Sequence, residues 1–111
     1  MNVIWKFPLT NEETEVEAHI VEFLTVQMQN DTPCVWAIVD PERTPKKYKI
    51  SILGTGWKCQ KIDASKYIGT VQVGMFVWHC FWESVPIYKN VKESTFAMFS
   101  KHSNQDKAAF Y

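Results

Sequence analysis

The stretch that most constrains the fold runs from Tyr67 to Glu83, with the sequence YIGTVQVGMFVWHCFWE. It reads as two β-type runs that meet near Gly74, and side chains alternate between the faces of a strand. One face of the second run carries Met75, Val77, His79 and Phe81, and the other carries Phe76, Trp78, Cys80 and Trp82. Large side chains on both faces do not suit a half-solvated edge. This strand therefore needs cover on both sides, from a closed sheet or from a partner chain.

Turn-forming residues separate four earlier β-type segments. These predicted strands are Val3–Leu9, Ile20–Gln29, Cys34–Val39 and Lys47–Ile52. In the second of them, alternation predicts that Leu24, Val26 and Met28 point inward. A helix beginning at Asn11 ranks behind a turn or loop, because the following residues do not sustain a helical apolar stripe. The Gly54-Thr55-Gly56 segment lacks the spacing of a phosphate-binding loop and predicts a turn.

These patterns predict an all-β fold, a small antiparallel β-sandwich or barrel of about six or seven short strands. A chain of 111 residues is long enough for one such domain. We expect the compact domain over residues 1–83 and a partly flexible C-terminal extension over 84–111, in which STFAMFSKH has the ends of a short helix. Between them, Asp63–Lys66 fits a single helical turn. The side chains predicted to be mostly buried are Trp36, Ile38, Ile50, Ile52, Trp78 and Phe81.

The net charge is zero, but the charges are segregated along the chain. Residues 10–42 contain eight acidic residues and no Lys or Arg, whereas residues 43–66 contain seven basic residues against Asp63 alone. One interpretation is that the two segments pair as neighbouring strands. The other is a basic face for an anionic ligand or an acidic partner. The candidate residues for that face are Lys46, Lys47, Lys49, Lys58 and Lys61, with Trp57 or Tyr48 to stack on a base.

The side chains that could carry catalysis or bind a metal form no recognisable motif. Cys34, Cys59 and Cys80 are odd in number and lie in or beside apolar runs, which favours reduced, buried thiols. His79 and Cys80 face opposite sides of one strand, and no CxxC or HxxxH spacing is present. A contact between His79 and Glu83 would more often be a satisfied pair than a catalytic dyad. We therefore expect no enzyme activity, no metal and no cofactor.

Several short motifs together resemble a known group of proteins. VQMQN, TPCVWAIVDP, LGTG, YIGT and the aromatic strand carrying His79 are similar to small phage-encoded proteins that are grouped only as a domain of unknown function. The resemblance covers roughly Val3 to Glu83, and TPCVWAIVDP is its most specific part. It implies a compact, mostly β phage accessory protein in the bacterial cytoplasm. It implies no activity and no catalytic residues.

Two binding functions of different class follow from these features. In the first, the protein masks a host protein, such as a defence protein, through Trp and Tyr side chains of the kind that dominate interfaces. In the alternative, it sequesters a small anionic ligand such as a signalling nucleotide. Single-stranded nucleic acid ranks third, because the net charge is zero and Arg43 is the only arginine.

The remaining expectations concern assembly and location. A strand that is apolar on both faces, in a domain this small, favours a homodimer or a higher oligomer. No apolar run approaches the roughly 20 residues that span a bilayer. The N-terminus lacks the apolar core and cleavage site of a signal peptide. We therefore expect a cytoplasmic protein with no membrane partner.

Overall fold

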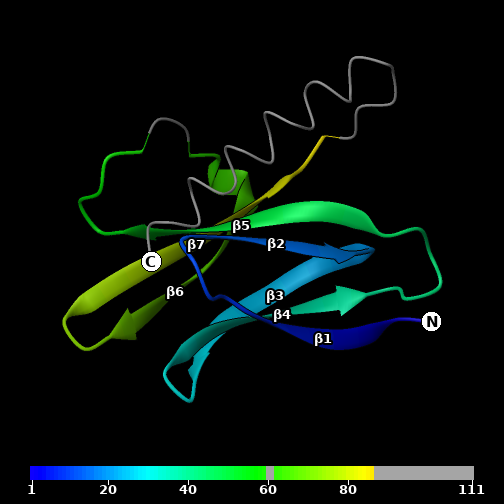
Figure 1. Ribbon diagram of the computed structural model, residues 1–111, viewed down its shortest axis with the longest axis horizontal. Helices are drawn as coiled ribbons and strands as arrows, with labels where there is room; N and C mark the ends of the chain where they lie inside the picture. Colours follow the sequence, from blue (N-terminus) through cyan, green and yellow to red (C-terminus); the bar gives the residue numbers. More distant parts are fainter. Residues whose placement is uncertain (60–61, 87–111) are drawn as a thin grey trace.

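The computed structural model describes residues 1–59 and 62–86, which form seven β-strands and one short 3₁₀ turn (Figure 1). All neighbouring strands within each sheet are antiparallel, so the predicted all-β antiparallel fold is confirmed. The strands are β1 (Val3–Pro8), β2 (Glu13–Ala18), β3 (Ile20–Gln29), β4 (Thr32–Val39), β5 (Lys46–Gly54), β6 (Tyr67–Val73) and β7 (Phe76–Ser84), and the 3₁₀ turn is η1 (Ala64–Lys66). The C-terminal extension predicted over 84–111 lies outside the described residues from residue 87 onward.

Two sheets form the domain and enclose the core between them. One has the strand order β1-β4-β3, and the other has the order β2-β5-β7-β6. Buried side chains of both sheets form the core, and its larger cluster includes Val35 of the first sheet and Ile50 of the second. Strands β3 and β6 also lie side by side where the two sheets approach each other. The domain is therefore a small β-sandwich rather than a closed barrel.

The inner faces supply a core that the sequence predicted only in part. Ile50 and Ile52 are buried as predicted. An aromatic cluster of Phe23, Tyr48 and Trp82 extends this core, with ring centroids 5.3–5.9 Å apart. Each of these rings comes from a different strand, and such contacts add about 0.5–1.5 kcal/mol per pair beyond area burial.

Trp36 and Ile38, which were predicted to be mostly buried, have intermediate exposure but point to the outer face of their sheet rather than into the core. Both side chains are half-buried, because alternation along β4 turns Val35, Ala37 and Val39 inward instead. The three inward residues are smaller than the two outward ones, so side-chain size alone does not identify the core face of this strand. The outer face of the β1-β4-β3 sheet consequently carries large apolar side chains.

The inward position predicted for Leu24 is also wrong, and two irregularities in β3 explain it. The pairing of β3 with β4 shifts by one residue between Ile20 and Glu22 and again between Phe23 and Thr25. Each shift adds an unpaired residue to β3, and such bulges redirect the side chains around them. Phe23 and Val26 therefore point into the core, while Leu24 is exposed.

The segment predicted as a turn or loop after Asn11 contains a seventh strand. Strand β2 pairs with β5, and its inward side chains are Val16 and Ala18, which are buried. The turn or loop was predicted for residues 11–14, and it is wrong for Glu13 and Thr14, which belong to β2. The lower-ranked helix beginning at Asn11 is also wrong. The strand was not predicted because its Glu residues are typical of a solvated segment. The single helical turn predicted near Asp63 is confirmed as η1.

The central strand β7 is covered differently on its two faces. Its inner face carries Cys80, which is fully buried, and Trp78 and Trp82, which are half-buried. On the outer face, Phe81 is half-buried and lies 5.4 Å from the ring of Tyr67 on β6. Trp78 and Phe81 are thus mostly but not fully buried, and Trp78 packs against the core cluster. The sandwich covers one face of β7, and neighbouring side chains of the same sheet partly cover the other.

Candidate binding surfaces

The outer face of the β2-β5-β7-β6 sheet carries a lattice of opposite charges. Glu15 of β2 lies opposite Lys49 of β5, and Glu17 lies opposite Lys47. On its other side, Lys49 lies opposite Glu83 of β7. The acidic and basic segments of the sequence are therefore neighbouring strands, which is the first of the two interpretations given above. We call the surface formed by Glu13, Glu15, Glu17, Lys47, Lys49 and Glu83 the charged face.

Lys49 is the centre of the charged face. Its Nζ lies 3.2 Å from Glu13 Oε2 and 3.1 Å from Glu83 Oε1, so one ammonium group links β2, β5 and β7. Partial burial by itself lowers the pKa of Lys49, but hydrogen bonds to Glu83 and Glu13 and their negative charges outweigh that effect. The pKa of Lys49 is consequently raised above its ordinary value. This lysine is engaged within the protein.

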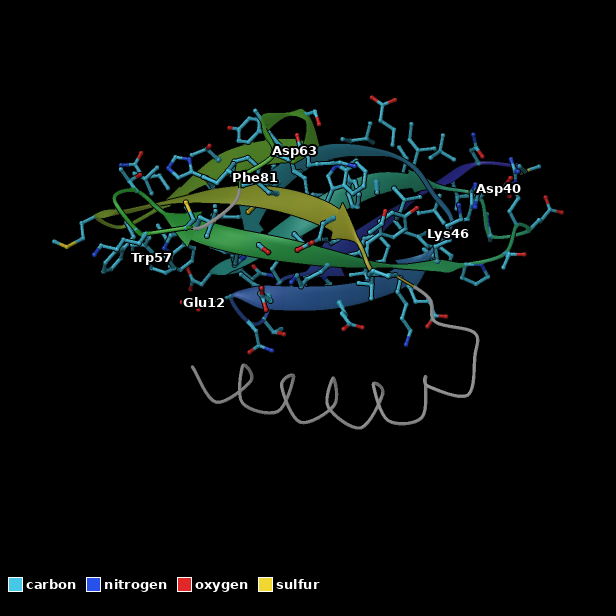
Figure 2. All side chains as sticks on the ribbon, turned by 90° about the horizontal axis from the view of Figure 1, so that it is seen from above. Glu12, Asp40, Lys46, Trp57, Asp63 and Phe81 are labelled. Carbon is cyan, nitrogen blue, oxygen red and sulfur yellow. The ribbon has the colours of Figure 1, made fainter. Side chains whose placement is uncertain are left out.

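The predicted lysine site is spread over the length of the sandwich. Lys46 and Lys47 are exposed at the beginning of β5, while Trp57 and Lys58 are exposed beyond its end. The strand between them is about 26 Å long at the usual rise per residue. Figure 2 shows Lys46 and Trp57 at opposite ends of the molecule. Lys61 lies outside the described residues, and Tyr48 is buried in the core.

The outer face of the β1-β4-β3 sheet carries exposed apolar side chains beside polar ones, since Lys6 lies opposite Trp36 and Glu22 lies opposite Ile38. Ile4 of β1 is 61% exposed, and Val21 and Leu24, the unpaired residues of the two β3 bulges, are 51% and 40% exposed. The half-buried Trp36 and Ile38 lie between them on β4. Ile4 lies directly opposite Ile38 in the strand pairing. We call the surface formed by Ile4, Val21, Leu24, Trp36 and Ile38 the apolar face.

Polar side chains border the apolar face. Lys6 Nζ on β1 donates a 2.5 Å hydrogen bond to Gln29 Oε1 on β3, so this contact crosses over β4. Lys6 pairs with Trp36 and Gln29 pairs with Thr32, which places Cys34 between the two positions on β4. Cys34 is buried although it belongs to the outer face. An apolar centre with a polar border is the usual composition of a protein–protein interface.

A cavity of about 390 Å³ opens at one end of the sandwich, between the two sheets. This volume falls within the range of small-molecule pockets. It is lined by Leu9, Thr10, Asn11, Glu12, Asp31, Thr32, Pro33, Ile52, Trp57 and Trp78. Trp57, the aromatic residue predicted to bind a base, forms part of the wall. The charged side chains among these described lining residues are carboxylates, so the cavity differs in charge from the predicted anion site.

His79 takes part in a chain of hydroxyl contacts on the outer side of β6 and β7. Its Nε2 lies 2.7 Å from Thr55 Oγ1, and its Nδ1 lies 3.0 Å from Thr70 Oγ1. Thr70 Oγ1 is in turn 2.5 Å from the hydroxyl of Tyr67. The contact considered between His79 and Glu83 does not form, because four residues along a strand separate side chains by about 13 Å. Both ring nitrogens are occupied by neutral partners.

The cysteines differ in their environments. Cys34 and Cys80 are buried, whereas Cys59 is exposed, contrary to the prediction that all three are buried. Burial raises the pKa of the Cys80 thiol to about 11, so this group is protonated and unreactive at neutral pH. Among residues 1–59 and 62–86, no three His, Cys, Asp or Glu side chains lie close enough to hold a metal ion together. The same residues contain no helix long and apolar enough to cross a bilayer.

Comparison with known proteins places the chain in a family. The fold and its surfaces define a small all-β domain with two contrasting outer faces and an end cavity. The chain belongs to the family described as "Domain of unknown function (DUF7352)", which matches residues 1–90. The domain-of-unknown-function membership predicted from the motifs is thereby confirmed, and the match extends a few residues beyond Glu83. Neither a curated protein nor a solved structure matches the chain.

Proposed function

We propose that this protein works by binding another protein through its apolar face and so masking a surface of that partner. The observation that supports this most strongly is the exposure of Ile4, Val21 and Leu24 around the half-buried Trp36. Apolar residues scattered singly on a surface need no explanation, but a contiguous group bordered by polar residues is typical of an interaction site. No catalytic step is required for this function.

The shape of the apolar face favours a protein partner over a small ligand. Its apolar residues lie on the outer side of a three-stranded sheet, and none of them lines the end cavity described above. Small ligands need concave sites that bury most of their surface, whereas proteins bind broad, gently curved ones. Trp36 and its neighbours would supply the desolvated centre that dominates the binding energy.

The alternative function, sequestration of a small anion by the lysines, has weaker support. Lys49 already binds two carboxylates, and Lys58 lies beyond the opposite end of β5 from Lys46. A phosphate group would have to compete with Glu13 and Glu83 for Lys49. Binding an anion at that position would also leave those carboxylates without their cation.

We infer that the partner is a bacterial host protein. The support for this is the resemblance of the motifs to small phage-encoded proteins, whose common need is to block host factors by binding. A component of host defence is the specific partner that we propose. The cytoplasm of the host bacterium is the corresponding location.

The experiment that tests this function compares two matched variants. In Ile4→Thr/Val21→Thr, two exposed β-branched residues of the apolar face become polar without loss of strand propensity. In the control, Ile62→Thr, a residue with the same exposure as Val21 changes in a loop outside both sheets. Tagged wild-type protein and both variants are incubated with bacterial lysate. The retained protein is identified and the complex is reconstituted from purified components.

The proposal predicts that the reconstituted complex forms with wild type and with Ile62→Thr and weakens at least tenfold with Ile4→Thr/Val21→Thr. Equal affinity for all three proteins would contradict it. A second copy of this chain is the competing occupant of the apolar face. If the wild type is a homodimer and the double variant is a monomer, with no partner protein retained, the face is a self-association surface and the masking function is wrong.

A further inference from the structure

The end cavity combines aromatic walls with carboxylates, a composition that the proposed masking function does not use. Trp57, which follows β5, and Trp78 of β7 both line it. Indole rings are the strongest aromatic partners for cations. Glu12 and Asp31 line the same cavity. These two acids come from separate connections, one before β2 and one between β3 and β4.

The position of the Trp57 ring is fixed by the backbone beneath it. A Cβ atom added to Gly54 would lie 2.5 Å from Trp57 Cε2 and 2.6 Å from its Nε1. The indole therefore rests directly on the Gly54 backbone, and only glycine leaves room for it there. The amide of Trp57 also donates a hydrogen bond of 3.0 Å to the Gly54 carbonyl. The Trp57 ring therefore packs against the Gly54 backbone while 48% of the residue remains exposed.

Within the described residues, neither carboxylate has a cationic partner. Among the ion pairs formed by residues 1–59 and 62–86, none involves Glu12 or Asp31. The contrast with the charged face is direct, because Glu13 and Glu83 share Lys49 there. The backbone carbonyl of Glu12 accepts a hydrogen bond from Ile52, which anchors the chain at this point without using the carboxylate.

We propose that this cavity binds an arginine side chain presented by a partner protein. A planar guanidinium can stack on an indole while it donates paired hydrogen bonds to a carboxylate. It is also hydrated more weakly than an ammonium group, so it enters an apolar cavity at lower cost. A phosphate or a carboxylate would be repelled by Glu12 and Asp31. The inference is independent of the apolar face, whose residues on the outer side of the β1-β4-β3 sheet do not line the cavity.

The probe for this proposal is N-acetyl-arginine methylamide, compared with its neutral isostere N-acetyl-citrulline methylamide and with the lysine analogue. Each is titrated into the ¹⁵N-labelled full chain, and the indole N–H signals of Trp57 and Trp78 are followed by NMR. A single side chain is expected to bind with a dissociation constant on the order of 1–10 mM. The arginine compound should shift both indole signals. The citrulline compound should bind at least tenfold more weakly, and the lysine analogue should fall between them.

Three variants locate the site. In Glu12→Gln/Asp31→Asn the cavity keeps its shape but loses its charge, and Asn tolerates the positive φ of 64° at position 31. Gly54→Ala displaces the Trp57 ring. The control, Glu22→Gln, removes an exposed carboxylate from β3, outside the cavity. The proposal predicts tenfold weaker binding in the first two proteins and unchanged binding in the control.

Three results would overturn the proposal. Equal binding of arginine and citrulline compounds would mean that the cavity accepts apolar or uncharged groups without regard to charge. Unchanged affinity in Glu12→Gln/Asp31→Asn would place the cation elsewhere on the acidic surface. No shift of the Trp57 and Trp78 signals at a probe concentration of about 20 mM would exclude the site. None of these results bears on Ile4→Thr/Val21→Thr, so this proposal and the masking function fail separately.

Discussion

Strand alternation forms both outer faces of the sandwich, but the outward side chains are ion-paired on one face and apolar and exposed on the other. On the charged face, the outward residues of β2, β5 and β7 find partners within the chain, and Lys49 joins all three strands. On the apolar face, the outward residues of β1, β3 and β4 include Ile4, Val21 and Leu24, which remain exposed. The charged face forms ion pairs within the chain, whereas the apolar face leaves apolar side chains exposed among the described residues.

This difference shows why segregated charge was a poor guide to a ligand site. Acidic and basic runs in a sequence suggest a polarised surface, but adjacent antiparallel strands bring the two runs together and cancel them. The apolar face could not be predicted in the same way, because its large apolar residues cannot be distinguished from core residues in the sequence. The more informative sign of a binding surface is therefore a large apolar side chain that the structure leaves exposed.

The largest expected effect is a difference in stability between a substitution in the core and the same substitution on the apolar face. Ile50→Ala removes a side chain that is 0% exposed and should destabilise the fold by about 2–5 kcal/mol. Ile38→Ala makes the same chemical change at a half-buried position and should cost about 1 kcal/mol. Urea unfolding followed by tryptophan fluorescence measures both. Equal costs would show that Ile38 belongs to a core.

A smaller effect is expected from reversing charges on the charged face. Lys49→Glu removes two ion pairs and adds a third carboxylate beside Glu13 and Glu83, so it should lower stability by about 1–2 kcal/mol. Lys47→Glu, on the same face of the same strand, should cost less than about 0.5 kcal/mol because Lys47 is exposed. Thermal unfolding of the two variants checks this. Identical melting temperatures would mean that the Lys49 network is not structural.

The smallest effect concerns alkaline pH. Because the pKa of Lys49 is raised in the folded protein, its ion pairs contribute fully below the unfolded pKa of 10.5 and are lost as pH rises through the higher folded pKa. The stability difference between wild type and Lys49→Met should therefore be constant near neutral pH and shrink above about pH 10.5. Unfolding free energies measured from pH 7 to 11.5 test this. A difference that grows at alkaline pH would contradict the sign of the shift.

Much of the fold could be predicted from the sequence, because strand alternation and turn residues are local signals. The buried positions of Ile50 and Ile52 follow from the regular pattern of β5. The inward and outward choice on β4 could not be predicted, since Val35 and Trp36 are both apolar and only the opposing sheet decides between them. The bulges of β3 were equally hidden, because an extra residue at Val21 or Leu24 depends on the partner strand.

The candidate sites were predictable to a smaller extent. Trp57 and Tyr48 were predicted as the aromatic residues of a lysine-rich anion site, and Trp57 instead lines the end cavity. Its neighbours there were not predicted, because Glu12, Asp31 and Trp78 are far apart in the sequence and meet only through the sandwich. The lysines of β5 were identified by charge alone, which does not reveal that Lys49 has two partners.

The most direct test of the central claim is the methyl spectrum of the labelled protein with and without its purified partner. Ile4, Val21, Leu24 and Ile38 report on the apolar face, while Ile62 and Val77 report on surfaces away from it. The account predicts that the first four methyl groups shift or broaden on complex formation and that the other two do not. Changes at Ile62 and Val77 with an unperturbed apolar face would show that the protein binds its partner elsewhere.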